Sequence, residues 1–70
     1  MNIKAVVGRN LKQYREAKGF SQEQLAFEAD LHRTYVSGVE RGIRNPTVLI
    51  VAKLANALGV DPAKLLEFNG

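Results

Sequence analysis

The sequence contains no cysteine, two prolines and a single histidine, His32. Without cysteine, neither a disulfide bond nor a thiolate metal site can supplement the core. No stretch approaches the roughly 18 consecutive apolar residues of a membrane-spanning helix, so we expect no membrane partner. Residues 1–10 have too short an apolar run for a signal peptide and lack a small-residue cleavage pattern. We therefore expect a cytoplasmic protein.

Residues that could carry enzymatic chemistry are also few. Asp30, His32 and Ser37 are the residue types of a hydrolase triad, but they lie within eight residues of one another and would point in different directions. The carboxylates have no metal-ligand spacing, and no glycine-rich phosphate loop follows a strand. We expect no catalytic residues, no metal and no other cofactor. His32 suits the N-cap position of a following helix, or a position that faces solvent or phosphate.

What the sequence does contain is a small domain with unevenly distributed charge. Its 70 residues predict one domain over 1–70, whose core is marginal unless the helices pack well or the protein dimerises. The net charge is +3 and the sequence pI is near 9.6. Residues 1–45 hold eight Lys or Arg against five Asp or Glu, whereas residues 46–70 hold two of each. The whole excess lies in the first part of the chain, which favours an anionic partner there.

Capping residues and apolar spacing predict five helices and no strand. Residues suited to cap the start of a helix precede four of them: Asn2, Ser21, Thr47 and Asp61. Glycines suited to end a helix follow at three places: Gly19, Gly42 and Gly59. The first helix should bury four apolar residues: Ile3, Val7, Leu11 and Tyr14. The predicted fold class is all-α, a compact bundle of about five short helices.

Residues 21–42 are predicted to form two short helices joined by a tight turn, a helix-turn-helix. Ser21 and Gln24 fit a capping box at the start of helix 22–29, and Asp30 suits a left-handed turn. On helix 33–41, one side holds Tyr35, Val36 and Val39, and the other holds Arg33, Thr34, Ser37, Gly38 and Arg41. This outer side suits close approach to a polar, anionic surface, or is simply solvated. Helix 48–58 is apolar nearly all round, so we expect it to be covered on more than one side.

Several motifs in residues 8–60 occur together. They are Gly8, Leu11, Arg15, Gly19, SQEQLA at 21–26, Ala29, LHRTYVSGVERG at 31–42, RNP at 44–46 and ALGV at 57–60. With this pattern the chain resembles the Cro/C1-type (XRE-like) helix-turn-helix family of bacterial and phage transcriptional regulators. The TYVSGVERG stretch is also similar to the small controller proteins of restriction-modification systems, and to other short family members. The resemblance implies a lambda-repressor-like DNA-binding domain in which helix 22–29 crosses the DNA backbone and helix 33–41 enters the major groove.

Carried onto this sequence, the resemblance implies base contacts from Arg33, Thr34, Ser37 and Gly38. A guanidinium such as that of Arg33 can pair with guanine O6 and N7, and the Thr34 methyl can touch a thymine methyl. Gly38 stands where relatives carry a long polar residue, so its contribution would be steric. The implied phosphate contacts come from Gln22, Tyr35, Arg41, Arg44 and Asn45. The ring of Tyr35 could pack inside with only its hydroxyl reaching a phosphate, and Arg44 could equally be a solvated loop charge.

The resemblance also implies a structural role and an assembly. Arg15 and Glu40 match the positions of a buried ion pair, and Leu49 and Ile50 occupy positions that are commonly polar in relatives. From these we predict dimerisation through residues 48–68, with an interface that includes Leu49, Ile50, Lys53, Leu65 and Phe68.

The function predicted from the sequence is transcriptional regulation by sequence-specific binding to double-stranded DNA. We expect a homodimer that binds a palindromic operator and acts as a repressor or autoregulatory controller. We expect it in the cytoplasm, associated with the nucleoid, and without a small-molecule ligand. The alternative is a protein-interaction module, or an antitoxin-like co-regulator, on the same scaffold. That alternative would more naturally carry apolar residues in place of Arg33, Thr34 and Ser37.

Overall fold

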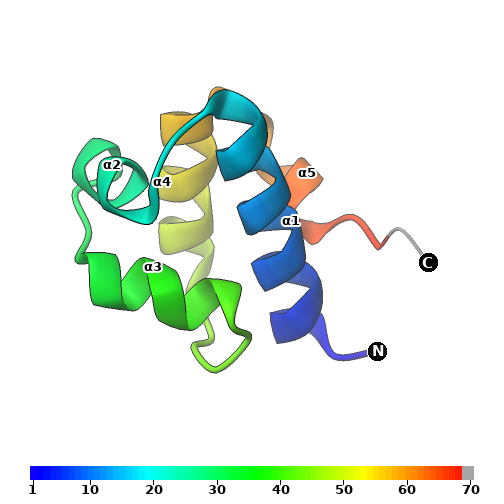
Figure 1. Ribbon diagram of the computed structural model, residues 1–70. Helices are drawn as coiled ribbons and strands as arrows, with labels where there is room; N and C mark the ends of the chain where they lie inside the picture. Colours follow the sequence, from blue (N-terminus) through cyan, green and yellow to red (C-terminus); the bar gives the residue numbers. More distant parts are fainter. Residues whose placement is uncertain (69–70) are drawn as a thin grey trace.

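The computed structural model describes residues 1–68 and contains five helices packed around one core (Figure 1). They are α1 (Ile3–Lys18), α2 (Gln22–Glu28), α3 (Arg33–Glu40), α4 (Val48–Leu58) and α5 (Pro62–Leu66). No strand occurs among these 68 residues, so the all-α prediction is confirmed. None of the helices within this range has the length and apolar character needed to cross a membrane.

Side chains close the starts of four helices as predicted. The N-cap oxygens of Asn2, Ser21, Thr47 and Asp61 each accept a hydrogen bond from a backbone N–H in the first turn. At the other ends, Gly19 and Gly59 take left-handed conformations with φ of 80° and 70°. Asp30 also has a positive φ, 58°, and so makes the tight turn between α2 and α3. Local sequence chemistry therefore sets most of the helix boundaries.

Three local predictions need correction. The Gln24 side chain donates to Glu28 Oε2 at 2.8 Å, so the capping box keeps only the bond from Gln24 N to Ser21 Oγ. Helix α3 ends at Glu40, one residue early, because the backbone reverses at Gly42 with a φ of 76°. Helix α2 also ends one residue early, at Glu28 rather than at residue 29.

The core combines side chains from all five helices. Its largest fully buried apolar side chains are Leu11, Leu25, Val36, Val39, Leu54 and Leu65. In α1, Val6 is buried and Ile3 is exposed, contrary to the predicted pattern, because Ile3 lines an open hollow beside α4 and α5. Helix α4 packs against α1, α2 and α5, so the prediction that it is covered on more than one side is confirmed, while its first two residues, Val48 and Leu49, are exposed. The core therefore occupies the C-terminal two thirds of α4 and leaves its start apolar and open.

Gly8 and Asn10 connect α1 to distant parts of the chain. A methyl group added at Gly8 would lie only 2.5 Å from the carbonyl oxygen of Val39 and 2.7 Å from that of Glu40, so glycine is required for the approach of α1 to α3. The Asn10 side chain is buried, and its Nδ2 donates to the carbonyl oxygens of Leu65 at 2.9 Å and Glu67 at 2.8 Å. These two residues of α1 position the third and fifth helices respectively.

Candidate nucleic-acid interface

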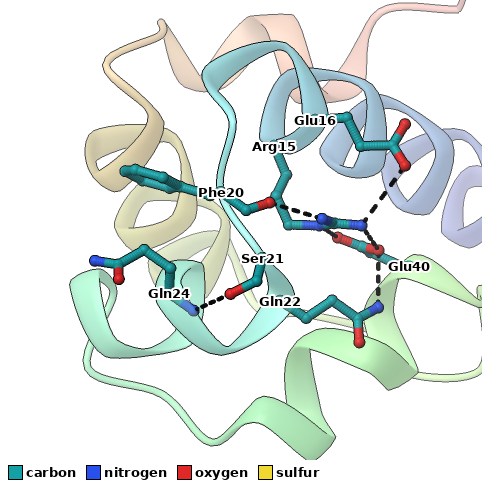
Figure 2. Close-up of polar contacts among 7 residues, drawn as sticks. All are labelled: Arg15, Glu16, Phe20, Ser21, Gln22, Gln24 and Glu40. Atoms are coloured by element: carbon teal, nitrogen blue, oxygen red, sulfur yellow. Dashed lines mark hydrogen bonds and ion pairs between the residues drawn. The ribbon is translucent and has the colours of Figure 1, made fainter.

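A polar network buried at the end of α3 fixes the placement of the helix-turn-helix (Figure 2). The Arg15 guanidinium donates to both carboxylate oxygens of Glu40, from Nε at 2.6 Å and from Nη2 at 3.1 Å. Its Nη1 donates to the carbonyl oxygen of Phe20 at 2.8 Å, and Gln22 Nε2 donates to Glu40 Oε1 at 3.0 Å. One carboxylate therefore joins the end of α1, the start of α2 and the end of α3.

The two charged side chains of this network are buried. Only 4% of the Glu40 side chain is exposed, and Arg15 is also buried. The hydrogen bond to Glu40 raises the pKa of Arg15 above its ordinary value, while burial opposes that rise. Among residues 1–68, every buried side-chain nitrogen or oxygen has a hydrogen-bond partner. The predicted pairing of Arg15 with Glu40 is thus present, with bidentate geometry.

The Gln22 side chain can donate a second hydrogen bond besides the one to Glu40. An amide NH₂ group has two hydrogens, and the bond to Glu40 uses one of them. The side chain is half-buried, at the first position of α2, so part of it remains accessible. The fixed amide can therefore donate its second hydrogen to an anionic oxygen outside the protein.

Helices α2 and α3 pack against each other on one side of the molecule (Figure 1). Val36 and Val39 of α3 are fully buried, whereas Arg33 and Thr34 at its start are exposed. Ser37 is half-buried on the same side. Five exposed residues of α3 and the loop after it make up what we call the α3 face: Arg33, Thr34, Arg41, Arg44 and Asn45, the last of which also lines a hollow beside α1 and α4. Three cations on one face can attract an anionic partner.

Gly38 shares the outer side of α3 with Thr34 but, contrary to the prediction, this side is not open to solvent at Gly38. Gly38 is buried, because the side chain of Arg44 folds back over it from the loop after α3. A methyl group at this position would lie 2.5 Å from Arg44 Cγ. The hydrophobic pattern of α3 contains no signal for this contact, since Arg44 comes from outside the helix.

The remaining candidate contact residues on and beside α3 differ in exposure. Tyr35 is half-buried and packs against the core, in agreement with the alternative that its ring faces inward. Arg41 occupies the C-cap of α3. His32 occupies the N-cap position of α3, but its side chain makes no capping hydrogen bond and is exposed.

The predicted dimer residues separate into three groups by exposure. Leu49, Lys53 and Phe68 are exposed, and Ile50 is half-buried against the core. Leu65 is 0% exposed and cannot contact a partner, so that prediction is wrong; in the single turn of α5, the neighbouring Leu66 points outward instead.

Sequence reasoning also missed Val48, which is 88% exposed. We call the exposed apolar set Val48, Leu49, Leu66 and Phe68 the α4–α5 face. Beside it is a hollow of about 260 Å³ whose lining is almost entirely apolar and includes Ile3, Val7, Pro46 and Ala52. The exposed Val48 of this face also lines the hollow.

The helix-turn-helix geometry can now be compared with known proteins. The model of the HTH_3 family, described as helix-turn-helix, matches residues 11–65. This range contains all of α2 and α3. The chain belongs to the HTH_3 helix-turn-helix family. This HTH_3 chain is 50% identical to the control protein C.BamHI of Bacillus amyloliquefaciens over 69 residues, which cover 97% of this chain and 85% of the relative.

Solved structures of HTH_3-type proteins have the same arrangement. The restriction-modification controller protein C.AhdI from Aeromonas hydrophila superposes with a TM-score of 0.86 at 48% identity, over 89% of this chain and 94% of that one. The master regulator for biofilm formation SinR, solved in complex with DNA, superposes with a TM-score of 0.83 at 35% identity, over 87% of this chain and 98% of that one. The predicted fold and family are confirmed.

Proposed function

We propose that this chain is a transcriptional regulator that binds double-stranded DNA sequence-specifically, with α3 in the major groove. The observation that carries the proposal is the two-sided α3, buried through Val36 and Val39 and exposing Arg33 and Thr34 to solvent. The bound DNA of the similar SinR structure supports it. A regulator of this kind would act in the cytoplasm, at the nucleoid.

The predicted contact residues divide into two roles. Arg33 and Thr34, with Ser37 one turn further on, contact base edges, since a guanidinium and a hydroxyl both recognise base atoms in the major groove. Gln22, Arg41 and Asn45 contact phosphates and fix the register of the protein on the duplex, with the Tyr35 hydroxyl as a further donor. In this arrangement the Arg15–Glu40 pair makes no DNA contact but holds the Gln22 amide in place.

We further propose that the protein binds as a homodimer through the α4–α5 face. This surface exposes 66% of Leu49 and 57% of Phe68, and a second copy would remove both from water. Helix α4 follows α3 directly through the loop at 41–47, so a two-fold contact there brings two recognition helices together. Such a dimer would recognise half-sites separated by roughly 10 bp, about 34 Å along the DNA.

The regulatory role that we propose is control of restriction-modification genes, including the gene for the protein itself. Its similarity to C.BamHI over nearly the whole chain and to the C.AhdI controller structure supports this role. The concentration of the protein would then set its occupancy of the operator through the monomer–dimer equilibrium.

Selection of bound sites from random double-stranded DNA tests the proposal. We expect enrichment of a two-fold symmetric site, and binding that weakens as a power of salt concentration. Arg33→Ala should flatten the preference at one base pair of each half-site. Lys12→Ala, which removes an exposed cation on α1, is the matched control and should leave the selected site unchanged. Failure of the native chain to enrich any sequence would refute the proposal.

A further inference from the structure

Arg44 lies across the recognition helix although it belongs to the following loop. Its backbone N–H donates to the carbonyl oxygen of Gly38 at 3.2 Å, as does that of Ile43 at 3.0 Å. Its side chain then passes over Gly38 itself, with Cγ, Nε and Cδ all within 3.5 Å of where a Cβ would be. The side chain of a loop residue thus occupies the space that a side chain at position 38 would fill.

The Arg44 side chain can lie over α3 in this way only because residue 38 is glycine. The nearest atom to an added methyl group would be Arg44 Cγ at 2.5 Å, far inside normal contact distance. Cγ is close to the root of the side chain, and the root is held by the backbone hydrogen bond to Gly38. Arg44 therefore cannot retreat slightly; it must rotate about χ1 and leave the helix surface.

The position is well placed for DNA recognition. Gly38 follows Thr34 by four residues, so the two share one side of α3. Arg44 is exposed, and Arg15 and Lys64 are the cations in the ion pairs formed within residues 1–68. Its guanidinium therefore stays available to an outside partner.

We propose that Gly38 is a positioning residue for specificity: its missing side chain lets Arg44 lie along α3 and contact one base step beyond those contacted by Arg33 and Thr34. This inference rests on the proposed function. It replaces the expectation that Gly38 contributes only empty space, and it turns Arg44 from a phosphate-contacting residue into a base-contacting one.

A double-mutant cycle read by site selection tests the coupling. Gly38→Ala and Arg44→Ala should each flatten the preference at the same base step, by roughly 5- to 150-fold, the range for loss of a bidentate contact to a base. The double variant should be no worse than Arg44→Ala alone, because the alanine at position 38 acts only through Arg44. Alanine favours helix over glycine, so folding should survive, and circular dichroism melting checks this.

Arg44→Lys separates base contact from charge. Lysine keeps the positive charge but lacks the planar fork, so it should restore overall affinity and salt dependence without restoring the base preference. Restoration of the full preference by lysine, or a uniform loss on all sequences with Arg44→Ala, would overturn the base contact. An unaltered site with Gly38→Ala, or additive losses in the double variant, would overturn the positioning role.

Arg33→Ala in the same selection distinguishes this inference from the proposed function. If the native chain enriches an operator and Arg33→Ala alters it at its own base pair, the proposed function stands whatever Gly38→Ala does. If the native chain enriches nothing, the proposed function itself fails.

Discussion

The α3 face and the α4–α5 face of this protein meet solvent with opposite chemistry. The first displays three arginines and is held from behind by the buried network of Arg15, Glu40 and Gln22. The second displays four apolar side chains, and beside it lies the apolar hollow of about 260 Å³. This difference underlies the two partners that we propose. Salt should weaken binding to a polyanion such as DNA, and should hardly affect binding to a second apolar surface. Four substitutions test this contrast.

Removal of the network behind the α3 face should have the largest effect. Glu40→Ala leaves the Arg15 guanidinium buried without its carboxylate, and we expect a loss of about 3 to 5 kcal/mol in the free energy of unfolding. Chemical and thermal denaturation measure it. Glu16→Ala, which removes an exposed carboxylate 4.0 Å from the same guanidinium, is the control and should have an effect below about 1 kcal/mol. The double change Arg15→Met with Glu40→Leu should recover most of the stability, and an unchanged melting curve for Glu40→Ala would exclude the role.

A charge placed on the α4–α5 face should weaken the proposed association while leaving the monomer folded. Burial of one leucine contributes about 1.5 to 3 kcal/mol, so Leu49→Lys should raise the dimer dissociation constant at least about tenfold. Sedimentation velocity at tens of micromolar measures it, with Gln13→Lys on the exposed side of α1 as the matched charge control. A native chain that is monomeric under these conditions, with DNA or without, would rule out this interface.

Loss of a single base contact should be smaller and local in sequence. Arg33→Ala should weaken binding to the selected operator by about 1 to 3 kcal/mol and much less on random DNA. Titration of both duplexes by fluorescence anisotropy measures the difference. Equal losses on both duplexes would mean that Arg33 contacts phosphate rather than a base.

The smallest expected effect is that of Gln22→Ala, at about 1 kcal/mol for one lost hydrogen bond to phosphate. Because phosphate carries no sequence information, operator and random DNA should weaken alike. Gln24→Ala is the control on the same helix, since that amide bonds to Glu28 instead. A selective loss on the operator would move Gln22 to the base-contacting group.

Local chemistry explains why so much of the fold could be predicted from sequence. Asn2, Ser21 and Thr47 cap their own helices through bonds to backbone two or three residues away, and Gly19 ends α1 through its own φ. These features depend only on residues that are close together in the sequence. The Arg15–Glu40 pair spans 25 residues and was predicted only through the family resemblance.

Features that depend on contacts between distant parts of the chain could not be predicted from the local sequence. A helix of five residues, α5, has too few positions to show which of Leu65 and Leu66 faces inward. Hydrophobicity alone also cannot tell a core residue from an exposed apolar residue, so Val48 was not distinguished from the buried residues of α4. The cover of Gly38 by Arg44 likewise depends on the path of a loop.

The Asn10 side chain makes the short helix α5 dependent on α1. A five-residue helix cannot persist alone in water, and Asn10 bonds to carbonyl groups 55 and 57 residues away. Opening of α5 should therefore be a distinct, low-energy unfolding event, in which Leu65 leaves the core and the α4–α5 face loses its shape. In the proposed dimer a partner subunit would bind only the closed form, so amide hydrogens of α5 should exchange more slowly as protein concentration rises. Such concentration-dependent protection would make the short C-terminal helix a folding element that is completed by assembly.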